Sequence, residues 1–354
     1  MFLYNTKSKE ELKERLMAET FQRRTISFYR YFYLDHPEEF RNEIFEAWDN
    51  LGCLGRIYVA REGINAQMSV PDYNWEKFEA AMTNWEIFQN IPIKYAVEDD
   101  GKSFYKLTIK VRPKLVADGL KEDEYDVTNV GNHLEALEFH ELVARPDTIV
   151  VDMRNHYESE VGHFEGAICP DADTFRDEIR MVEEDLKEKK DQKILLYCTG
   201  GIRCEKASAY LRNKGFTDVN QLYGGVIEYA QQVKKANVPS RFIGKNFVFD
   251  ERLGERISDE IISFCHQCGA ICDTHTNCAN NDCHLLFIQC NECAQEYARC
   301  CSVECKTVNS STEEERLVFR QNLHEKYAQS KIFRSRLRPD LKKINLISVF
   351  SEKK

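Results

Sequence analysis

Long apolar runs are absent from this sequence. No stretch approaches the roughly 20 consecutive apolar residues that a helix needs to cross a bilayer. Residues 1–11 contain no basic region followed by an apolar segment, which is the pattern of a secretory signal peptide. From these absences we expect a protein that neither spans a membrane nor is exported, and we predict that it works in the cytoplasm.

The chain also lacks an excess of positive charge and the common redox-cofactor motifs. Its 49 Lys and Arg residues are outnumbered by 59 Asp and Glu residues, for a formal net charge of -10. This balance argues against general binding to polyanions, although a local basic patch remains compatible with nucleic acid. There is no glycine-rich dinucleotide fingerprint and no triad of iron ligands. The sequence therefore identifies no cofactor for redox chemistry.

The length and composition are those of a globular protein with several domains. A chain of 354 residues that is 42% hydrophobic has room for two or three domains. Residues 1–111 read as strand, helix, strand, strand, helix, strand, which predicts a ferredoxin-like (acylphosphatase-like) α+β sandwich with both helices on one face. The expected strands are residues 25–33, 56–60, 65–70 and 104–111, and the expected helices are residues 37–51 and 75–85, after a first short helix at residues 9–18.

Beyond the sandwich the pattern changes. Residues 112–130 contain proline, glycine and an acidic cluster, and we interpret them as a linker. In residues 131–240 helices and strands alternate, which predicts a parallel sheet covered on both faces, with its site at the carboxyl ends of the strands. Residues 241–306 are a cysteine-rich segment that we expect to bind metal. Residues 307–354 are a charged tail, whose basic stretch 331–343 either contacts phosphates or stays solvated.

The most distinctive stretch joins an apolar strand to a helix and reads Tyr197-Cys198-Thr199-Gly200-Gly201-Ile202-Arg203. Its two glycines let successive backbone amides point inward, and the following helix adds its positive end, so the loop favours an anion. A thiol in such surroundings ionises easily, and the thiolate is the nucleophile. We therefore predict Cys198 as the catalytic residue. The predicted anion-binding residues are Thr199, Gly200, Gly201, Ile202 and Arg203.

Simpler interpretations of the cysteines near this loop stay open. Cys198 would then be a small buried residue at the end of a core strand. Cys204, one residue past Arg203, would either form a disulfide with an oxidised Cys198 or serve only as a small residue in the first helical turn.

Ten of the 14 cysteines lie between Cys265 and Cys305. In a chain without an export signal, such crowding predicts metal binding or redox chemistry instead of a disulfide framework. The predicted metal ligands are two Cys-x-x-Cys pairs, Cys265 with Cys268 and Cys290 with Cys293, whose separation suits a four-cysteine structural zinc site. An iron-sulfur cluster is the alternative, so the cofactor stays open. A second site is plausible among the remaining cysteines with His275 and His284, but the spacing does not assign its ligands.

Two parts of the central region resemble rhodanese domains. Residues 151–154 (VDMR) and 157–167 (YESEVGHFEGA) closely resemble the first conserved signature of these domains. Residues 198–203 resemble their active-site loop, in which a cysteine carries a persulfide. A related phosphatase family has the same fold with a longer loop, so the short Cys-x-x-x-x-Arg spacing favours sulfur chemistry over phosphate chemistry. The resemblance implies a rhodanese α/β domain.

Similarity to one family covers nearly all of residues 23–305. Segments 24–29, 62–67, 100–104 and 241–250, together with the cysteine-rich segment, resemble the bacterial rhodanese-domain tRNA uridine(34) hydroxylases. This resemblance implies an oxidoreductase that uses O2 to convert the wobble uridine, in the anticodon region of certain tRNAs, to 5-hydroxyuridine. It also implies that Cys198 is catalytic.

The residues themselves leave two other functions open. One is a sulfurtransferase that carries a persulfide on Cys198. The other is a zinc-stapled tRNA-binding module whose rhodanese part is inactive. Nothing in the sequence indicates the protein partners, the oligomeric state, the choice of tRNAs or the way oxygen is activated. Because flavin and iron motifs are missing, we expect a persulfide or an oxidised form of Cys198 to carry the redox step.

Overall fold

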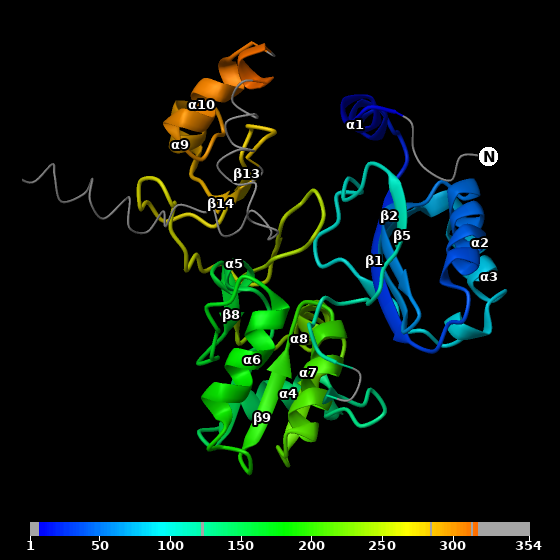
Figure 1. The fold of residues 1–354 in the computed structure, drawn as a ribbon, viewed down its shortest axis with the longest axis vertical. Coiled ribbons are helices and arrows are strands. Elements are labelled where there is room, and N and C mark those ends of the chain that lie inside the picture. The colour runs from blue at the N-terminus through cyan, green and yellow to red at the C-terminus, as the bar shows by residue number, and fades with distance from the viewer. Residues whose placement is uncertain (1–6, 122–123, 284, 313, 318–354) are drawn as a thin grey trace, which may run out of the picture. The chain divides into compact units, whose positions relative to one another are not determined.

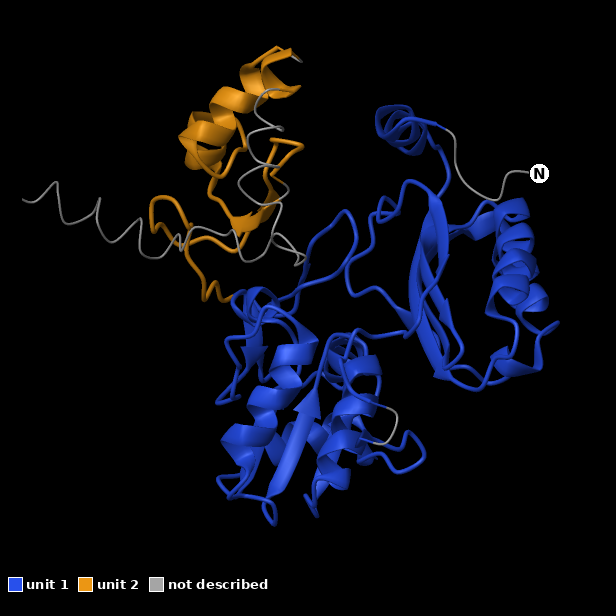
Figure 2. Ribbon diagram, in the orientation of Figure 1, with its two compact units in different colours: residues 1–259 blue, residues 260–354 orange. Residues whose placement is uncertain are grey.

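The computed structural model describes residues 7–121, 124–283, 285–312 and 314–317. The chain divides into two compact units, Met1–Asp259 and Glu260–Lys354 (Figure 2). The basic stretch 331–343 expected in the tail lies outside the described residues. Within the part of the chain that is described, no helix combines the length and the apolar character that crossing a bilayer demands.

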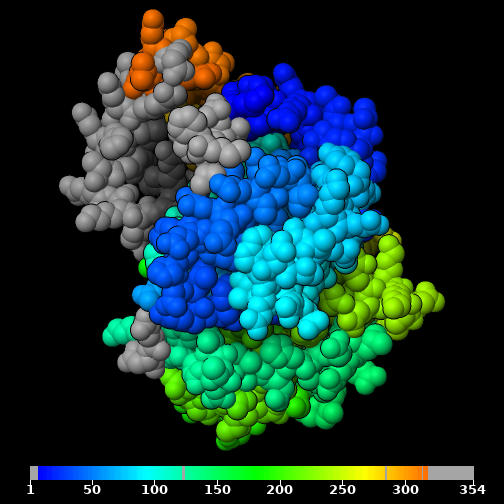
Figure 3. All heavy atoms as spheres, turned by 90° about the vertical axis from the view of Figure 1, so that its right-hand side faces the viewer, coloured from blue at the N-terminus to red at the C-terminus, as the bar shows by residue number. Residues whose placement is uncertain are grey.

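The first unit begins with an α+β sandwich, as predicted. Ser8 caps the first helix, α1 (Lys9–Met17), by accepting a hydrogen bond of 3.1 Å from the amide of Glu11. The next two helices, α2 (Pro37–Asn50) and α3 (Trp75–Met82), lie on one face of a five-stranded sheet (Figure 1) and form the blue and cyan surface of Figure 3. The strands, in the order β4-β1-β3-β2-β5, are β1 (Arg23–Tyr31), β2 (Leu54–Ala60), β3 (Gly63–Pro71), β4 (Lys94–Tyr95) and β5 (Leu107–Val111), with short 3-10 helices η1 (Asp72–Asn74) and η2 (Glu86–Phe88).

One strand of the sandwich departs from the expected series. The predicted fourth strand, residues 104–111, becomes β5, which pairs parallel with β2 at one edge of the sheet. The two-residue strand β4 occupies the place beside β1. It pairs antiparallel with β1, and Lys94 lies opposite Ser27. Two residues are too few to show an alternating pattern, so the sequence contains no signal for β4.

A parallel α/β layer follows, which confirms the predicted sheet. Its strands, in the order β6-β10-β9-β7, are β6 (Asn132–Leu134), β7 (Thr148–Asp152), β9 (Lys193–Tyr197) and β10 (Val219–Leu222). The helices α4 (Ala136–Val143) and α8 (Gly225–Lys235) share one core cluster, and α6 (Phe175–Leu186) and α7 (Ile202–Asn213) share another. Leu195 of β9 packs in the first cluster and Leu196 in the second. Burial on both faces explains the uninterrupted apolar run of residues 194–197 in β9.

A small antiparallel sheet completes the first unit. After α5 (His156–Ser159), the strand β8 (Gly162–Phe164) pairs with β11 (Phe242–Asn246), which in turn pairs with β12 (Glu255–Arg256). The three residues of β8 and the first three of β11 are direct partners, from Phe164 opposite Phe242 to Gly162 opposite Gly244. The chain beyond residue 240 thus packs against the α/β layer before the second unit begins at Glu260.

The second unit has little regular structure in its described residues. It contains β13 (His275–Asn277) and β14 (Leu286–Ile288), which form an antiparallel pair, and the helices α9 (Asn291–Glu296) and α10 (Val303–Ser310). One of its buried clusters consists of Phe287 with three cysteines, Cys278, Cys300 and Cys301. Apolar side chains contribute little to such a cluster, so a unit of this kind generally needs cross-links to stay folded.

A buried lysine joins the sandwich to the α/β layer. Lys206 of α7 is fully buried, and its Nζ lies 2.9 Å from both carboxylate oxygens of Glu62, in the turn between β2 and β3. The same ammonium contacts the buried carboxylate of Asp118 in the connecting segment. The ring centres of Tyr31 and Tyr125 lie 5.8 and 5.3 Å from it. Three separate segments of the chain therefore meet at one charge.

Replacing Lys206 by methionine is expected to lower the free energy of unfolding by about 3 kcal/mol, because the carboxylates of Glu62 and Asp118 lose their shared cation. The matched control is Lys187→Met, which removes an exposed pair with Glu184 and should change stability by less than about 0.5 kcal/mol. Urea unfolding followed by circular dichroism measures both. Equal unfolding midpoints for the two variants would argue against a structural role for Lys206.

Candidate active site and cysteine clusters

The predicted catalytic residue lies in a loop that turns a backbone amide toward its sulfur. Cys198 directly follows β9, and α7 begins at Ile202. Gly201 has a φ of +98°, a left-handed conformation that glycine adopts without strain. The Gly201 amide donates a hydrogen bond of 3.1 Å to Cys198 Sγ. The sulfur therefore lies at the start of α7, where the helix carries its partial positive charge.

A second helix start supports the loop from another side. The amide of Val226, in the first turn of α8, donates a hydrogen bond of 3.0 Å to the carbonyl of Cys198. Gly225 packs so closely that a Cβ there would come within 2.5 Å of the same carbonyl oxygen. By contrast, a Cβ on Gly200 would meet no atom within 4 Å. The predicted anion-binding residues 199–203 thus form a loop between two helix starts that is open at Gly200, and their binding of an anion remains a prediction.

Hydrogen bonding and charge make Cys198 strongly acidic for a thiol. Burial by itself raises the pKa of Cys198, but a hydrogen bond from the Cys204 thiol, the charge of Arg203 and nearby backbone amides together lower it to about 5. The same contact acts in reverse on its partner, because burial and the hydrogen bond to Cys198 hold the pKa of Cys204 well above its usual value. At neutral pH Cys198 is therefore a thiolate, and Cys204 is a thiol that donates to it.

Arg203 is held in place by a residue that the sequence pattern did not single out. Its Nη1 and Nη2 donate hydrogen bonds of 2.6 and 2.9 Å to the two carboxylate oxygens of Glu158. Glu158 lies in α5 and is fully buried, and the hydroxyl of Thr199 also donates to it at 3.3 Å. Arg203 therefore acts on Cys198 as a fixed neighbouring charge. The one available signal for Glu158 was its place in the rhodanese-like segment 157–167.

Two side chains of the sandwich also reach this loop, and neither was predicted. Tyr29 of β1 donates a hydrogen bond of 2.9 Å to Glu205 of α7, and its hydroxyl lies 2.8 Å from the position of a Cβ on Gly201. Lys94 of β4 is 5% exposed, and its Nζ lies 4.6 Å from the ring centre of Tyr29. Burial lowers the pKa of Lys94 to about 8, and the negative charge of Cys198 opposes that drop. The sandwich thus adds a hydroxyl and an amine beside the loop.

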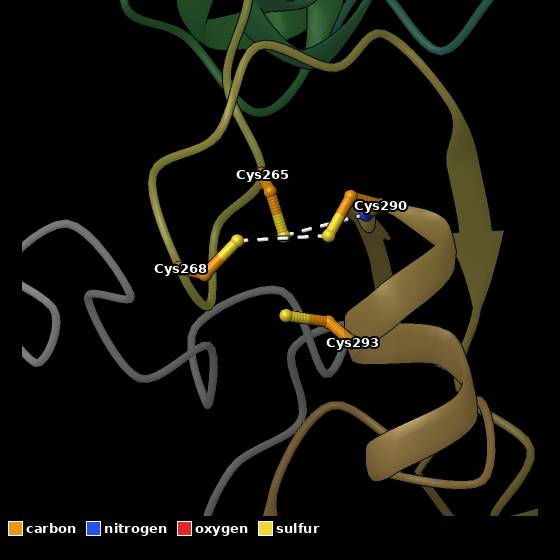
Figure 4. Close-up of side chains that lie close together, drawn as sticks. All are labelled: Cys265, Cys268, Cys290 and Cys293. Carbon is orange, nitrogen blue, oxygen red and sulfur yellow. Dashed lines mark hydrogen bonds between the residues drawn. The ribbon is translucent and has the colours of Figure 1, made fainter.

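The predicted metal ligands converge in the second unit. Cys265 and Cys268 come from a loop, whereas Cys290 and Cys293 lie at the start of α9, and Figure 4 shows their sulfurs pointing toward one another. All four Sγ atoms lie within 4.8 Å of one another, and those of Cys268 and Cys290 are 3.6 Å apart. A tetrahedral zinc ion with bonds of about 2.3 Å holds its sulfurs about 3.8 Å apart, whereas a disulfide joins them at about 2.05 Å. The geometry therefore fits a metal site.

A second group of four cysteines has the same geometry. The Sγ atoms of Cys278, Cys283, Cys301 and Cys305 lie within 4.8 Å of one another. The sulfur of Cys301 is 3.7 Å from that of Cys283 and 3.6 Å from that of Cys305, and its amide donates a hydrogen bond of 3.4 Å to Cys278 Sγ. The sequence left these ligands unassigned because their spacing does not form Cys-x-x-Cys pairs.

Of the other candidate ligands of this region, those that the structure describes do not join either group. Cys272 Sγ accepts a hydrogen bond of 3.4 Å from the amide of Thr274, and Cys300 is buried among the cysteines of the second group without being part of it. His275 is buried in β13. His284 lies outside the described residues.

Models of three domain families match consecutive parts of the chain. The UPF0176 acylphosphatase like domain matches residues 23–115, the Rhodanese-like domain matches residues 135–232, and the Rhodanase C-terminal model matches residues 243–306. A tRNA uridine(34) hydroxylase of Leptospira interrogans is 51% identical over 97% of this chain and 93% of its own length. Proteins of the same name from Photorhabdus laumondii and Pectobacterium carotovorum are 52% and 53% identical over 86% of this chain, and over 87% and 86% of their own lengths. The chain belongs to the tRNA uridine(34) hydroxylase family.

Membership in the tRNA uridine(34) hydroxylase family confirms the resemblance seen in the sequence. The Rhodanese-like match contains the Cys198 loop together with Glu158, and the Rhodanase C-terminal match contains both groups of four cysteines. The predicted succession of an α+β sandwich, a rhodanese-like parallel sheet and a cysteine-rich segment is therefore confirmed as well.

In this member of the family, iodoacetamide is expected to alkylate Cys198 with a midpoint near pH 5, because only the thiolate reacts and the pKa of Cys198 is about 5. The alkylation rate should be constant at neutral pH and fall as the pH drops through 5. Cys204→Ala removes the thiol donor and should move the midpoint to higher pH. Mass spectrometry of the Cys198 peptide measures the rate, with Cys53, whose pKa burial raises to about 12, as an internal reference. A midpoint near the ordinary thiol pKa of about 8.5 would overturn the expectation.

Proposed function

We propose that this protein hydroxylates C5 of uridine 34 in tRNA, yielding 5-hydroxyuridine, with O2 as the oxygen source and Cys198 as the catalytic residue. The observation that carries the proposal is the 51% identity to a tRNA uridine(34) hydroxylase over 97% of the chain. That name states the nucleoside and its position. The C5 atom, the use of O2, recognition of the anticodon region, a cytoplasmic location and the role of Cys198 are parts of our proposal.

The surroundings of Cys198 support redox chemistry at its sulfur. A thiol with a pKa of about 5 is ionised at neutral pH, so it needs no separate base before it reacts. The Gly201 amide, at 3.1 Å, stabilises negative charge on the sulfur. The ammonium of Lys94 is a donor of the kind that the carbonyl oxygens of a uracil ring accept, and Tyr29, whose hydroxyl donates to Glu205, lies beside it.

A sulfurtransferase is the second candidate, because the same amide and the charge of Arg203 would also stabilise a persulfide on Cys198. A tRNA-binding module with an inactive rhodanese part is less well supported. In an inactive rhodanese part, Cys198 would not need the buried arginine and the thiol donor that together lower its pKa. We therefore rank the hydroxylase first and the sulfurtransferase second.

We further propose that each group of four cysteines holds one structural zinc ion. Zinc accepts four thiolates in tetrahedral geometry and is redox-inert, so its contribution there is to cross-link a unit with few apolar contacts. The amide of Cys290 donates a hydrogen bond of 3.4 Å to Cys265 Sγ. Hydrogen bonds of this kind stabilise the charged thiolates that bind zinc. An iron-sulfur cluster is the alternative occupant of the same ligands.

Expression of the protein in a host whose tRNA lacks 5-hydroxyuridine is expected to produce that nucleoside, measured by mass spectrometry of digested tRNA. Cys198→Ser should lower its yield at least about 100-fold, since removal of a nucleophile generally has effects of this size. Cys169→Ser is the matched control. Burial raises the pKa of Cys169 to about 12, so its thiol is unreactive and the variant should retain full activity. Equal yields from Cys198→Ser and the wild type would rule out a catalytic Cys198. If the wild type produced none, thiosulfate turnover would test the sulfurtransferase.

Elemental analysis of the purified protein is expected to find two zinc ions per chain, one for each group of four cysteines. The double variant Cys265→Ser/Cys290→Ser should retain one zinc ion, and so should Cys278→Ser/Cys301→Ser. Cys272→Ser is the control that should keep both ions, because Cys272 belongs to neither group. If iron and inorganic sulfide were found in place of zinc, the clusters would have a redox role instead of the proposed structural one. Folded protein without metal would refute both the zinc site and the iron-sulfur cluster.

A further inference from the structure

The proposed hydroxylation requires a two-electron reductant. One atom of O2 enters uracil at C5, and reduction of the other atom to water takes two electrons and two protons. Two thiols that become one disulfide release two electrons and two protons. A pair of cysteines close to the reacting carbon is therefore sufficient to balance the reaction.

The structure contains such a pair at the start of α7. Cys198 is 1% exposed and Cys204 is fully buried, and both belong to the core cluster that includes α6 and α7. Gly201 links the two cysteines, because its amide donates a hydrogen bond of 3.1 Å to Cys198 Sγ, and each cysteine shifts the pKa of the other. The amide of Cys204 donates a hydrogen bond of 3.0 Å to the carbonyl of Gly201, which fixes Cys204 in the first helical turn beneath the loop. The glycines between the two cysteines leave the backbone free to bring their sulfurs to the disulfide distance of about 2.05 Å.

The two sulfurs also differ in the way that such a reaction requires. Cys198 is the thiolate that an oxygen electrophile meets first, and Cys204 is a thiol that keeps its proton until it attacks. A reactive thiolate next to a second, resolving cysteine is the usual arrangement of a cysteine that is oxidised reversibly. Within the described residues of the first unit, Cys53 and Cys169 complete the cysteines, and burial raises the pKa of each to about 12.

We propose that Cys198 and Cys204 are the reductant of the hydroxylation and that each turnover leaves a disulfide between them. The inference rests on the proposed function, and it makes Cys204 a second catalytic residue. An external thiol then reduces the disulfide by exchange and returns the enzyme to its starting state.

Atoms and electrons balance across three steps. Uracil C5–H and O2 combine to a C5 hydroperoxide, whose outer oxygen is attacked by the Cys198 thiolate. The O–O bond breaks, the uracil oxygen takes a proton to become the hydroxyl group, and Cys198 becomes a sulfenic acid. The sulfur of Cys204 then attacks the sulfur of Cys198, the S–O bond breaks, and hydroxide leaves with the Cys204 proton as water. In sum, uridine, O2 and two thiols give 5-hydroxyuridine, water and one disulfide.

A single-turnover experiment with the full-length protein tests the proposal. The protein is reduced, freed of small thiols without air, and mixed with unmodified tRNA in air-saturated buffer. We expect no more than one 5-hydroxyuridine per chain and an equal amount of the peptide pair cross-linked through Cys198 and Cys204, both measured by mass spectrometry after free thiols are blocked. Without tRNA, the disulfide should form at least about tenfold more slowly. Added dithiothreitol should allow many turnovers.

Two variants test the role of Cys204 in the same reaction. Cys204→Ser should still form up to one product per chain, with Cys198 trapped as a sulfenic acid by dimedone, and should lose turnover at least about tenfold at low thiol concentration. Cys169→Ser is the control and should behave as the wild type. Many products per chain without added thiol, or one product without either disulfide or dimedone adduct, would overturn the proposal while leaving the hydroxylase intact. If the wild type with dithiothreitol formed no product at all, the proposed function itself would fail.

Discussion

The negative charge on the sulfur of Cys198 is the constraint around which the first unit is organised. Burial disfavours a charged sulfur, so the protein must supply every group that stabilises it. The parallel sheet delivers the residue at the end of β9, where α7 begins, and the left-handed conformation of Gly201 turns an amide toward the sulfur. Arg203 adds a full positive charge, and the buried carboxylate of Glu158 keeps that charge in one position.

The sandwich takes part in the same arrangement. Lys206 of α7 neutralises carboxylates from the β2–β3 turn and the connecting segment, so the α/β layer and the sandwich share a buried ionic contact. Along β1, Phe28 packs in the core of the sandwich, and Tyr29 therefore points to the opposite face, toward the loop. Groups from both parts of the unit thus surround the sulfur, and neither part contains the whole site.

The same residue type has two roles in this chain, and its surroundings choose between them. In the first unit, Cys198 and Cys204 lie as a thiolate and a thiol among hydrogen-bond donors and apolar side chains, which suits reversible oxidation. In the second unit, cysteines gather in fours at separations near those of a tetrahedral metal site. There the apolar core is small, so cross-linking by metal supplies what burial does not.

The sequence by itself determined the features that are written in neighbouring residues. A strand, two glycines and a helix start lie within residues 194–204, so the Cys198 loop could be located. Each Cys-x-x-Cys pair encodes its own turn, so one group of four cysteines could be located as well. The succession of helices and strands indicated both layers of the first unit. Only the tertiary structure decided which distant residues meet: Glu158 with Arg203, Tyr29 and Lys94 with the loop, and the four cysteines of the second group. Local hydrogen bonding depends on adjacent residues and can be predicted from them. Apolar burial is not directional, so it brings elements together without specifying which residues meet. The contact between Glu158 and Arg203, 45 residues apart, therefore follows only from how whole elements pack.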